Sequence, residues 1–180
     1  NDYEKNGLLY TYLSVPVGGL ADFSTMPPGT IPNHQSIVVE WRVPNPLDQT
    51  SVVDPLSARE LMRIDQTQFN HNGGQLVFGP EGTLFISLGD GGRASDLGIG
   101  HSPQGNGQDT SNVLGTILAI DPHERSSMNG QYGIPEDNPF APEGDDDLAG
   151  GALGCLDGFC DEIYAYGFRN PWRISFDEVQ

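Results

Sequence analysis

The stretch NHNGGQLVFGPEGTLFISLGDGGRASD, residues 70–96, contains the pattern that decides the fold. Its segments LVF (76–78) and TLFISL (83–88) have the apolar or alternating composition of short strands, and the GPEG between them has the residues of a tight turn. We therefore predict a β-hairpin here. Because a hairpin brings its two outer ends to the same rim, we expect His71 and Asp90 to lie close together on that rim.

The rest of the chain has the same character, with short apolar segments separated by loops rich in Gly, Pro and polar residues. No segment of useful length has the periodicity of a helix. Strands at regular short intervals are typical of sandwiches, barrels and propellers, so the pattern predicts an all-β fold. Besides the hairpin, the expected strands are 7–15, 36–43, 60–64, 112–121, 162–168 and 172–176.

Composition limits the classes of function. A chain of 180 residues with 24 Gly and 14 Pro fits one domain of many turns, and we expect residues 1–180 to belong to a single domain. The net charge of −17 argues against binding to nucleic acid and to anionic membrane surfaces. No apolar run approaches the ~20 residues of a membrane-spanning helix.

Two cysteines, Cys155 and Cys160, lie close together in GCLDGFC. A small disulfide loop, which would indicate an oxidising compartment, is one interpretation, and two free buried thiols are the other. A metal-binding pair is less favoured, because no second Cys/His pair accompanies it. The sequence leaves the choice open.

Two motifs, NHNGGQLVFGPEGTLFISLGDGG (70–92) and YGFRNPWRISFD (166–177), resemble the glucose/sorbosone dehydrogenase family. This family of six-bladed β-propellers includes soluble sugar dehydrogenases that use pyrroloquinoline quinone (PQQ) and extracellular hedgehog-interacting-protein-like proteins. The resemblance covers about residues 36–180. It implies a partial six-bladed propeller of roughly two to three blades, from a parent about twice as long, and such a piece alone is expected to be inactive.

For the parent protein, the resemblance implies oxidation of an aldose at its anomeric carbon to the lactone. Hydride would pass to PQQ, and electrons would then pass to an external acceptor, in the periplasm or outside the cell. His71 matches the family's base, a role that suits an imidazole, and Asp90 matches the carboxylate that orients it. Arg169 and Asn170 match the pair that contacts the quinone, whose carboxylates suit a guanidinium.

Three of these residues also have a structural interpretation. His71 could cap a loop, Asp90 could make a turn bond with backbone amides, and Arg169 could brace a turn between blades. Trp172 and Phe176 are expected in the core of a blade rather than beside a cofactor.

The chain departs from the family pattern in three places. Asn70 stands where the classical PQQ glucose enzymes carry Asp, as in the aldose-dehydrogenase-like and hedgehog-interacting-like branches. Thr116 and Ala119 replace two basic residues of the usual strand LLGKILRID, which weakens the case for anion contacts there.

No metal ligands are predicted in this chain. The Ca²⁺ that polarises PQQ in the family is expected to be bound by later blades. The loop 90–96 and the acidic run 145–147 do not fit the twelve-residue calcium loop, and the acidic run is expected to be a solvated tip. His34, His101 and His123 lie in loops without ligand spacing and receive no role.

The alternative function is a secreted, non-catalytic propeller that binds another extracellular protein, like the hedgehog-interacting branch. The cysteines favour this alternative, whereas the His71–Asp90 pair favours the enzyme. A third option, a lactone or phosphotriester hydrolase propeller, has little support, because such sites gather acidic and Asn ligands around one calcium.

Overall fold

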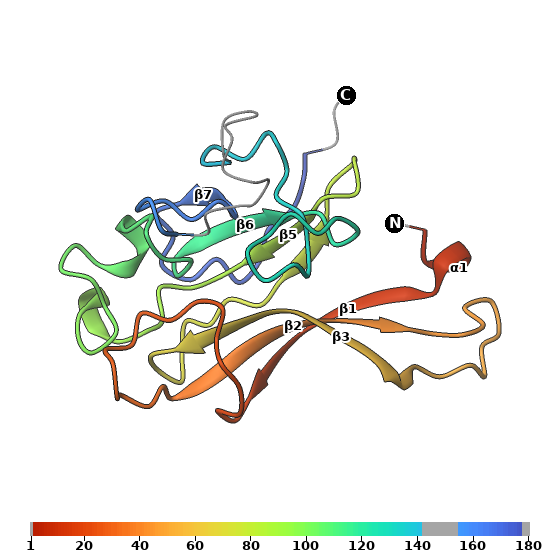
Figure 1. Cartoon of the computed structure of the whole chain (residues 1–180), viewed down its shortest axis with the longest axis horizontal. Coiled ribbons are helices and arrows are strands. Elements are labelled where there is room, and N and C mark those ends of the chain that lie inside the picture. Colours follow the sequence, from red (N-terminus) through yellow and green to blue (C-terminus); the bar gives the residue numbers. More distant parts are fainter. Residues whose placement is uncertain (1, 142–154, 178–180) are drawn as a thin grey trace.

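The computed structural model describes residues 2–141 and 155–177, and these residues form two antiparallel sheets with very little helix (Figure 1). The first sheet has the order β1-β2-β3 and the second has the order β4-β5-β6-β7. The all-β prediction is confirmed. In chain order the elements are α1 (Tyr3–Asn6), β1 (Leu8–Val15), β2 (His34–Arg42), β3 (Asp54–Gln66), β4 (Leu76–Phe78), β5 (Leu84–Ser87), the 3₁₀ turns η1 (Ala94–Asp96) and η2 (Asn106–Gln108), β6 (Thr116–Ile120) and β7 (Ile163–Tyr166).

The predicted hairpin is present as β4 and β5. Leu76 pairs with Ile86 and Phe78 with Leu84 in antiparallel register. The N–H of Gly79 donates to the carbonyl of Thr83 at 2.9 Å and closes the turn. All four residues of β5 are buried, so packing on both faces of the strand holds this register, rather than an alternation of buried and exposed side chains.

Strand β3 is longer than predicted. We expected residues 60–64, but the strand starts at Asp54 and includes Pro55. A proline is tolerated here because β3 is the outer strand of its sheet, where the ladder needs no N–H donor on the free side. The predicted bounds 60–64 were therefore too narrow at both ends, because β3 extends from Asp54 to Gln66.

The prediction of a strand at residues 172–176 was also wrong, because this segment has no strand assignment. It still lies along the hairpin. The Gln75 side chain donates through Nε2 to the carbonyl of Ile174 at 2.8 Å, and its Oε1 accepts the N–H of Ile174. Phe176 packs edge-to-face on Phe85 but remains 43% exposed, and Trp172 is 64% exposed. The expectation that these two aromatics lie in the core is not met.

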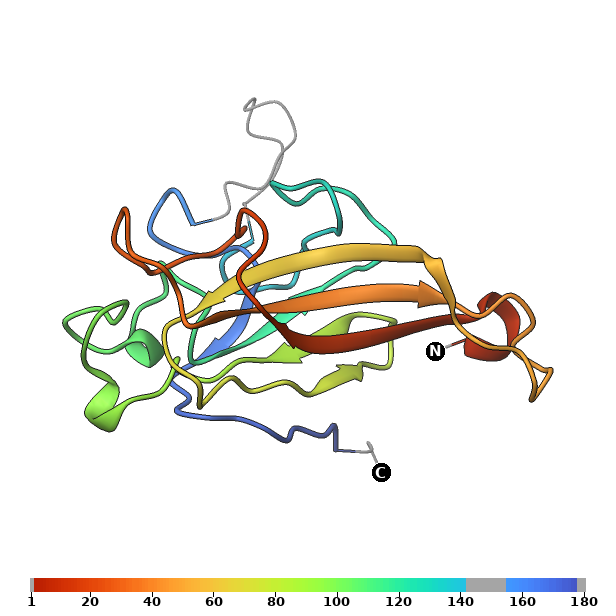
Figure 2. The ribbon, with the colours of Figure 1, turned by 90° about the horizontal axis from the view of Figure 1, so that it is seen from below.

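The core lies between the two sheets, which pack face to face in both views (Figures 1 and 2). Each sheet contributes apolar side chains that are removed from water, and this burial is the main favourable term for the packing. The fully buried members include Val38, Leu61, Met62 and Ile64 from the first sheet, and Leu84, Ile86, Leu118, Ile120 and Ile163 from the second.

Arg59 joins the first sheet to the loop that follows β6. Its guanidinium binds both carboxylate oxygens of Glu40, at 3.0 and 2.8 Å, and donates to the carbonyls of Pro122 and Gln131. Burial alone would raise the pKa of Glu40, but the hydrogen bonds from Arg59 and Tyr10 outweigh it, and the net effect lowers that pKa. A bidentate, partly buried pair of this kind fixes the geometry of both partners.

Cys155 and Cys160 form a disulfide, which decides between the interpretations that the sequence left open. Disulfides persist in oxidising environments. The acidic run at residues 145–147 lies outside the described residues. None of the helices in the described part of the chain is long and apolar enough to cross a membrane.

Candidate functional site

His71 lies in the loop between the two sheets and has a left-handed backbone, with φ 56°. A left-handed conformation is costly for a non-glycine residue and is maintained only where the surroundings impose it. Here the hydroxyl of Tyr12 donates to the carbonyl of Asn72 at 2.7 Å, and Asn72 Nδ2 donates to Gln66 Oε1 at 2.9 Å. Gly89 completes the fit, because any side chain at that position would overlap the His71 carbonyl.

Asp90 follows β5, and its backbone is held by extensions of the sheet hydrogen bonding. Its N–H donates to the carbonyl of Arg169 at 2.9 Å, and Gly115 N–H donates to the carbonyl of Gly89 at 2.8 Å. The Asp90 side chain is only 1% exposed. Its Oδ1 accepts the N–H of Gly92 at 2.8 Å, which fixes the carboxylate within the Gly-Asp-Gly-Gly turn.

The structure brings His71 and Asp90 together, with 2.8 Å between Nδ1 and Oδ1. A carboxylate can only accept, so it selects the imidazole tautomer with hydrogen on Nδ1. Nε2 then carries a lone pair, and within residues 2–141 and 155–177 no group hydrogen-bonds to it. The His71 side chain is 20% exposed. The arrangement can therefore accept a proton at Nε2, and the buried carboxylate would stabilise the charged ring.

Arg169 is on the same rim. Its Nη1 lies 3.2 Å from Asp90 Oδ2 and its Nη2 lies 3.4 Å from the carbonyl of Arg93, while its side chain is 56% exposed. The guanidinium is therefore anchored on one side and open to solvent on the other. Asn170 is exposed, and its Oδ1 lies close to Gly89. The four predicted site residues thus gather at one edge, and their functional roles stay a prediction.

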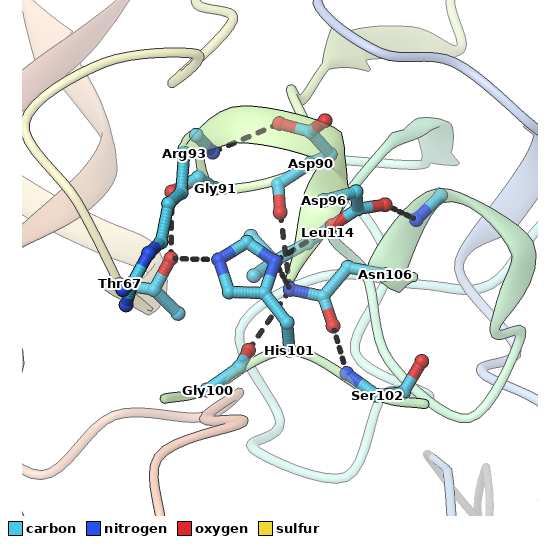
Figure 3. A network of polar contacts seen from close by, with 12 residues as sticks. Thr67, Asp90, Gly91, Arg93, Asp96, Gly100, His101, Ser102, Asn106 and Leu114 are labelled. Carbon is cyan, nitrogen blue, oxygen red and sulfur yellow. Dashed lines mark hydrogen bonds and ion pairs between the residues drawn. The ribbon is translucent and has the colours of Figure 1, made fainter. Parts of the chain in front are cut away.

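A second imidazole–carboxylate pair, which the sequence analysis missed, lies next to the turn that carries Asp90 (Figure 3). His101 Nδ1 lies 2.6 Å from Asp96 Oδ1, and His101 Nε2 lies 3.2 Å from Thr67 Oγ1. The His101 side chain is completely buried. The only sequence signal for this pair is an Asp and a His five positions apart in a glycine-rich loop, which is too common to assign a role.

A buried carboxyl, Glu162, lies in the core near the phenol of Tyr132. The Tyr132 hydroxyl donates to Glu162 Oε1 at 2.8 Å, whereas Oε2 has no hydrogen-bond partner among the described residues. Burial raises the pKa of Glu162 to about 7, although the hydrogen bond from Tyr132 opposes the rise. Burial also raises the pKa of Tyr132 well above its usual value.

Among the described residues, no group of three or more His, Cys, Asp or Glu is arranged to hold a metal ion. The hollow lined by Phe23, Ile64, Leu114 and Cys155 shares no residue with the rim of His71 and Asp90. The chemistry predicted from the sequence therefore lies on an open edge of the described structure.

The sequence model of the family described as Glucose / Sorbosone dehydrogenase matches residues 1–180. The chain belongs to this family. The match extends over more of the N-terminal part than the motifs suggested, which indicated residues 36–180.

Individual relatives have different names. The HIPL1 protein of Arabidopsis thaliana is 32% identical over 155 residues, 80% of this chain and 20% of that protein. The hedgehog-interacting protein of Mus musculus is 28% identical over 178 residues, 98% of this chain and 21% of that protein. The aldose sugar dehydrogenase YliI of Escherichia coli is 31% identical over 108 residues, 60% of this chain and 21% of that protein. The chain spans about a fifth of the length of these relatives.

Solved structures show the same fold. One described as a glucose dehydrogenase has a TM-score of 0.58 and 19% sequence identity, and the match covers 94% of this chain and 36% of that one. A second glucose dehydrogenase gives a TM-score of 0.56 at 20% identity. Together with the two antiparallel sheets, these likenesses confirm a partial β-propeller.

Proposed function

We propose that the protein to which this chain belongs is a quinoprotein that oxidises an aldose at its anomeric carbon to the lactone. The observation that carries the proposal is the pair of His71 and Asp90, with Nδ1 bound to a buried carboxylate and Nε2 open at the rim. Membership of the glucose/sorbosone dehydrogenase family, with an aldose sugar dehydrogenase among the relatives, supports the assignment of the substrate class.

His71 takes the part of general base. Its Nε2 accepts the proton of the anomeric hydroxyl, while the hydrogen on Nδ1 stays in the bond to Asp90. Asp90 is already in place and desolvated, so it stabilises the imidazolium without reorganising. Removal of such a base typically costs a factor of about 10²–10⁴.

Arg169 and Asn170 would hold PQQ, which supplies the hydride acceptor when bound. The donor chemistry fits, because the outer side of the Arg169 guanidinium is exposed and free to bind a carboxylate bidentately. Asp90 and the carbonyl of Arg93 hold the inner side, so the planar group is oriented before a ligand arrives. The Ca²⁺ of this mechanism is proposed to be held by parts of the protein other than the described residues, which offer no suitable cluster.

A second candidate function, an extracellular propeller that binds another protein, is favoured by one observation. The similarity to mouse hedgehog-interacting protein covers 98% of the chain. For either function we propose a periplasmic or extracellular location, which the Cys155–Cys160 disulfide supports.

The test uses the full-length product of the gene, expressed in the periplasm and supplied with PQQ and Ca²⁺. We would measure aldose-dependent reduction of a redox dye for the wild type, His71→Ala and His123→Ala. His123 is an exposed loop histidine that lines a hollow with Leu8 and Gly82, which shares no residue with the rim, and it serves as the matched control. Activity that requires PQQ, is lost in His71→Ala and persists in His123→Ala supports the enzyme. A folded protein that binds no PQQ would exclude it and leave the binding propeller.

A further inference from the structure

The second imidazole–carboxylate pair, His101 with Asp96, resembles a catalytic triad because the hydroxyl of Thr67 lies next to His101 Nε2. The geometry argues against that role. Thr67 is only 6% exposed, and its hydroxyl lies 2.6 Å from the carbonyl of Gly91, to which it must donate. A buried hydroxyl whose hydrogen is directed away from the imidazole cannot be activated as a nucleophile by it.

The hydrogen bonds instead determine where the protons are. A hydroxyl has one hydrogen, and that of Thr67 goes to the Gly91 carbonyl, which can only accept. Thr67 Oγ1 is therefore the acceptor at its 3.2 Å contact with His101 Nε2, so Nε2 carries a hydrogen.

The other ring nitrogen must share a hydrogen as well. His101 Nδ1 is 2.6 Å from Asp96 Oδ1, and Asp96 Oδ2 accepts the N–H of Gly107 at 3.1 Å. Asn106 Nδ2 is 3.4 Å from Nδ1, but its two hydrogens point to the carbonyls of Asp90 and Gly100, at 3.0 and 2.9 Å. The hydrogen in the short contact therefore lies between His101 and Asp96.

We infer that His101 is held as a doubly protonated imidazolium against an ionised Asp96, and that with Thr67 it positions the backbone next to Asp90. The pair has no net charge. The ionised form of Asp96 is favoured because its side chain is 19% exposed to water and its Oδ2 accepts the N–H of Gly107, and this carboxylate in turn stabilises the buried imidazolium. Of the charged groups on the surrounding loops, Asp96 is the one that contacts the ring, while Arg93 packs over Gly98 and the Asp90 carboxylate faces His71.

The connection to the candidate site runs through two carbonyls. Thr67 donates a hydrogen bond to the carbonyl of Gly91, and Asn106 donates one to the carbonyl of Asp90 (Figure 3). These bonds fix the two peptide groups that follow Asp90. Gly91 and Gly92 have φ 87° and 91°. Glycine has no side chain to restrict its backbone, so the conformation of this turn depends on contacts from its neighbours. Thr67, His101 and Asp96 are thus positioning residues for Asp90, and through Asp90 for His71.

The catalytic part of this inference rests on the proposed function, whereas the protonation state does not. Nitrogen-15 NMR of the histidine-labelled full-length protein at neutral pH, with His101→Asn to assign the signal, measures the protonation state directly. We expect both nitrogens of His101 in the protonated range. A His101 spectrum with one unprotonated nitrogen would overturn the inference, whatever the activity of the protein.

The positioning role is tested with Thr67→Val, which removes the hydroxyl at nearly constant shape, and with Thr67→Ser, which keeps it. We expect kcat for aldose oxidation to fall by roughly 10- to 100-fold in Thr67→Val, because small displacements of a catalytic group have effects of this size. KM should change little, and Thr67→Ser should retain most of the rate. Equal losses in the two variants would contradict the role of the hydroxyl. If Thr67→Val does not fold, Thr67→Ala, which also lacks the hydroxyl, is used in its place.

If the wild type shows no dehydrogenase activity, the proposed function fails but the positioning role is still measurable. The proton signal of the His71 Nδ1–H that is bonded to Asp90 should then shift in Thr67→Val and stay in place in Thr67→Ser. An unchanged His71 signal in Thr67→Val would overturn the coupling.

Discussion

The chain contains two imidazole–carboxylate pairs with nearly the same contact and opposite surroundings. Nδ1 meets a carboxylate oxygen at 2.8 Å in His71–Asp90 and at 2.6 Å in His101–Asp96. In the first pair the ring is 20% exposed and the carboxylate 1%, whereas in the second the ring is 0% exposed and the carboxylate 19%. The distal nitrogen is open in His71 and bonded to Thr67 in His101.

This comparison shows that the contact alone does not indicate function. A histidine acts as a base only if its second nitrogen can reach a substrate and exchange a proton. His101 has no such nitrogen, so its pair contributes shape and stability. His71 has one, and it also retains a strained left-handed backbone, a feature that is common at functional sites.

The largest expected difference between the two imidazole–carboxylate pairs is in the effect of a histidine substitution on activity. Under the proposed function, we expect His71→Asn to lower kcat/KM of the full-length protein by about 10²–10⁴, because it removes the proposed base while Asn still tolerates the left-handed backbone. His101→Asn should cost less, roughly 10-fold per folded molecule, because it acts only through position. The measurement is steady-state dye reduction, normalised to bound PQQ. Similar losses in both variants would erase the distinction.

For the free energy of unfolding, we expect the opposite order, with His101→Asn having the larger effect. His101→Asn breaks a buried pair and leaves space in a packed network, so we expect the free energy of unfolding to fall by about 3–5 kcal/mol. His71→Asn, at a partly exposed position, should change it by no more than about 1 kcal/mol. Chemical denaturation of both variants checks this. A His71→Asn protein that is the less stable of the two would contradict our account.

A third carboxyl sharpens the comparison by separating the pH dependence of stability from that of activity. The pKa of Glu162 is raised from 4.5 to about 7 by burial, so the folded state binds more protons than the unfolded state between these values. Its contribution to stability is therefore full below about pH 4.5 and is lost as the pH rises through 7. The full change is about 3 kcal/mol, because each pKa unit corresponds to about 1.4 kcal/mol.

We would measure the free energy of unfolding at pH 5 and pH 8 for the wild type and for Glu162→Gln. The wild type should lose more stability toward pH 8 than the variant does, because Gln does not titrate. Equal pH dependence in the two proteins would show that Glu162 is not the responsible group. Glu162 shares no hydrogen bond with either imidazole pair, so the activity of the folded enzyme should not follow this titration.

The smallest predicted effect concerns the disulfide, which lies apart from both pairs. Cys155 and Cys160 are five positions apart. A disulfide that closes so short a loop lowers the entropy of the unfolded chain and thereby stabilises the fold by about 2 kcal/mol. Cys155→Ser should lower the free energy of unfolding by that amount and leave the rate of dye reduction per folded molecule unchanged. A loss of activity in the folded variant would mean that the disulfide also shapes the candidate site.

The sequence was sufficient for features that depend on local patterns. The alternation in 83–88 and the GPEG turn predicted the hairpin, and the hairpin geometry placed His71 beside Asp90. The start of β3 was missed because Pro55 signals a loop in isolation, and only its place on an outer strand makes it acceptable. Residues 172–176 were predicted to form a strand, but in the structure the side chain of Gln75 contacts Ile174 where a strand would have a backbone partner. No sequence pattern reveals such a contact.

The second pair could not be predicted, for a related reason. It depends on the path of the loop through Arg93, Ser95 and Asp96, all with positive φ, and on two short 3₁₀ turns. Such a path has no periodicity, and none of these residue types demands it. The packing of neighbouring loops imposes it, and that packing is not visible in a single sequence.

The most direct test of the central claim is the reactivity of the two imidazoles in the same molecule. Diethyl pyrocarbonate acylates accessible, unprotonated histidine, and mass spectrometry of the full-length protein would report the modification of each site with and without PQQ. Our account predicts that His71 is modified, that PQQ protects it, and that His101 stays unmodified under both conditions. Modification of His101 at a rate equal to that of His71, or of His71 without any protection by PQQ, would contradict it.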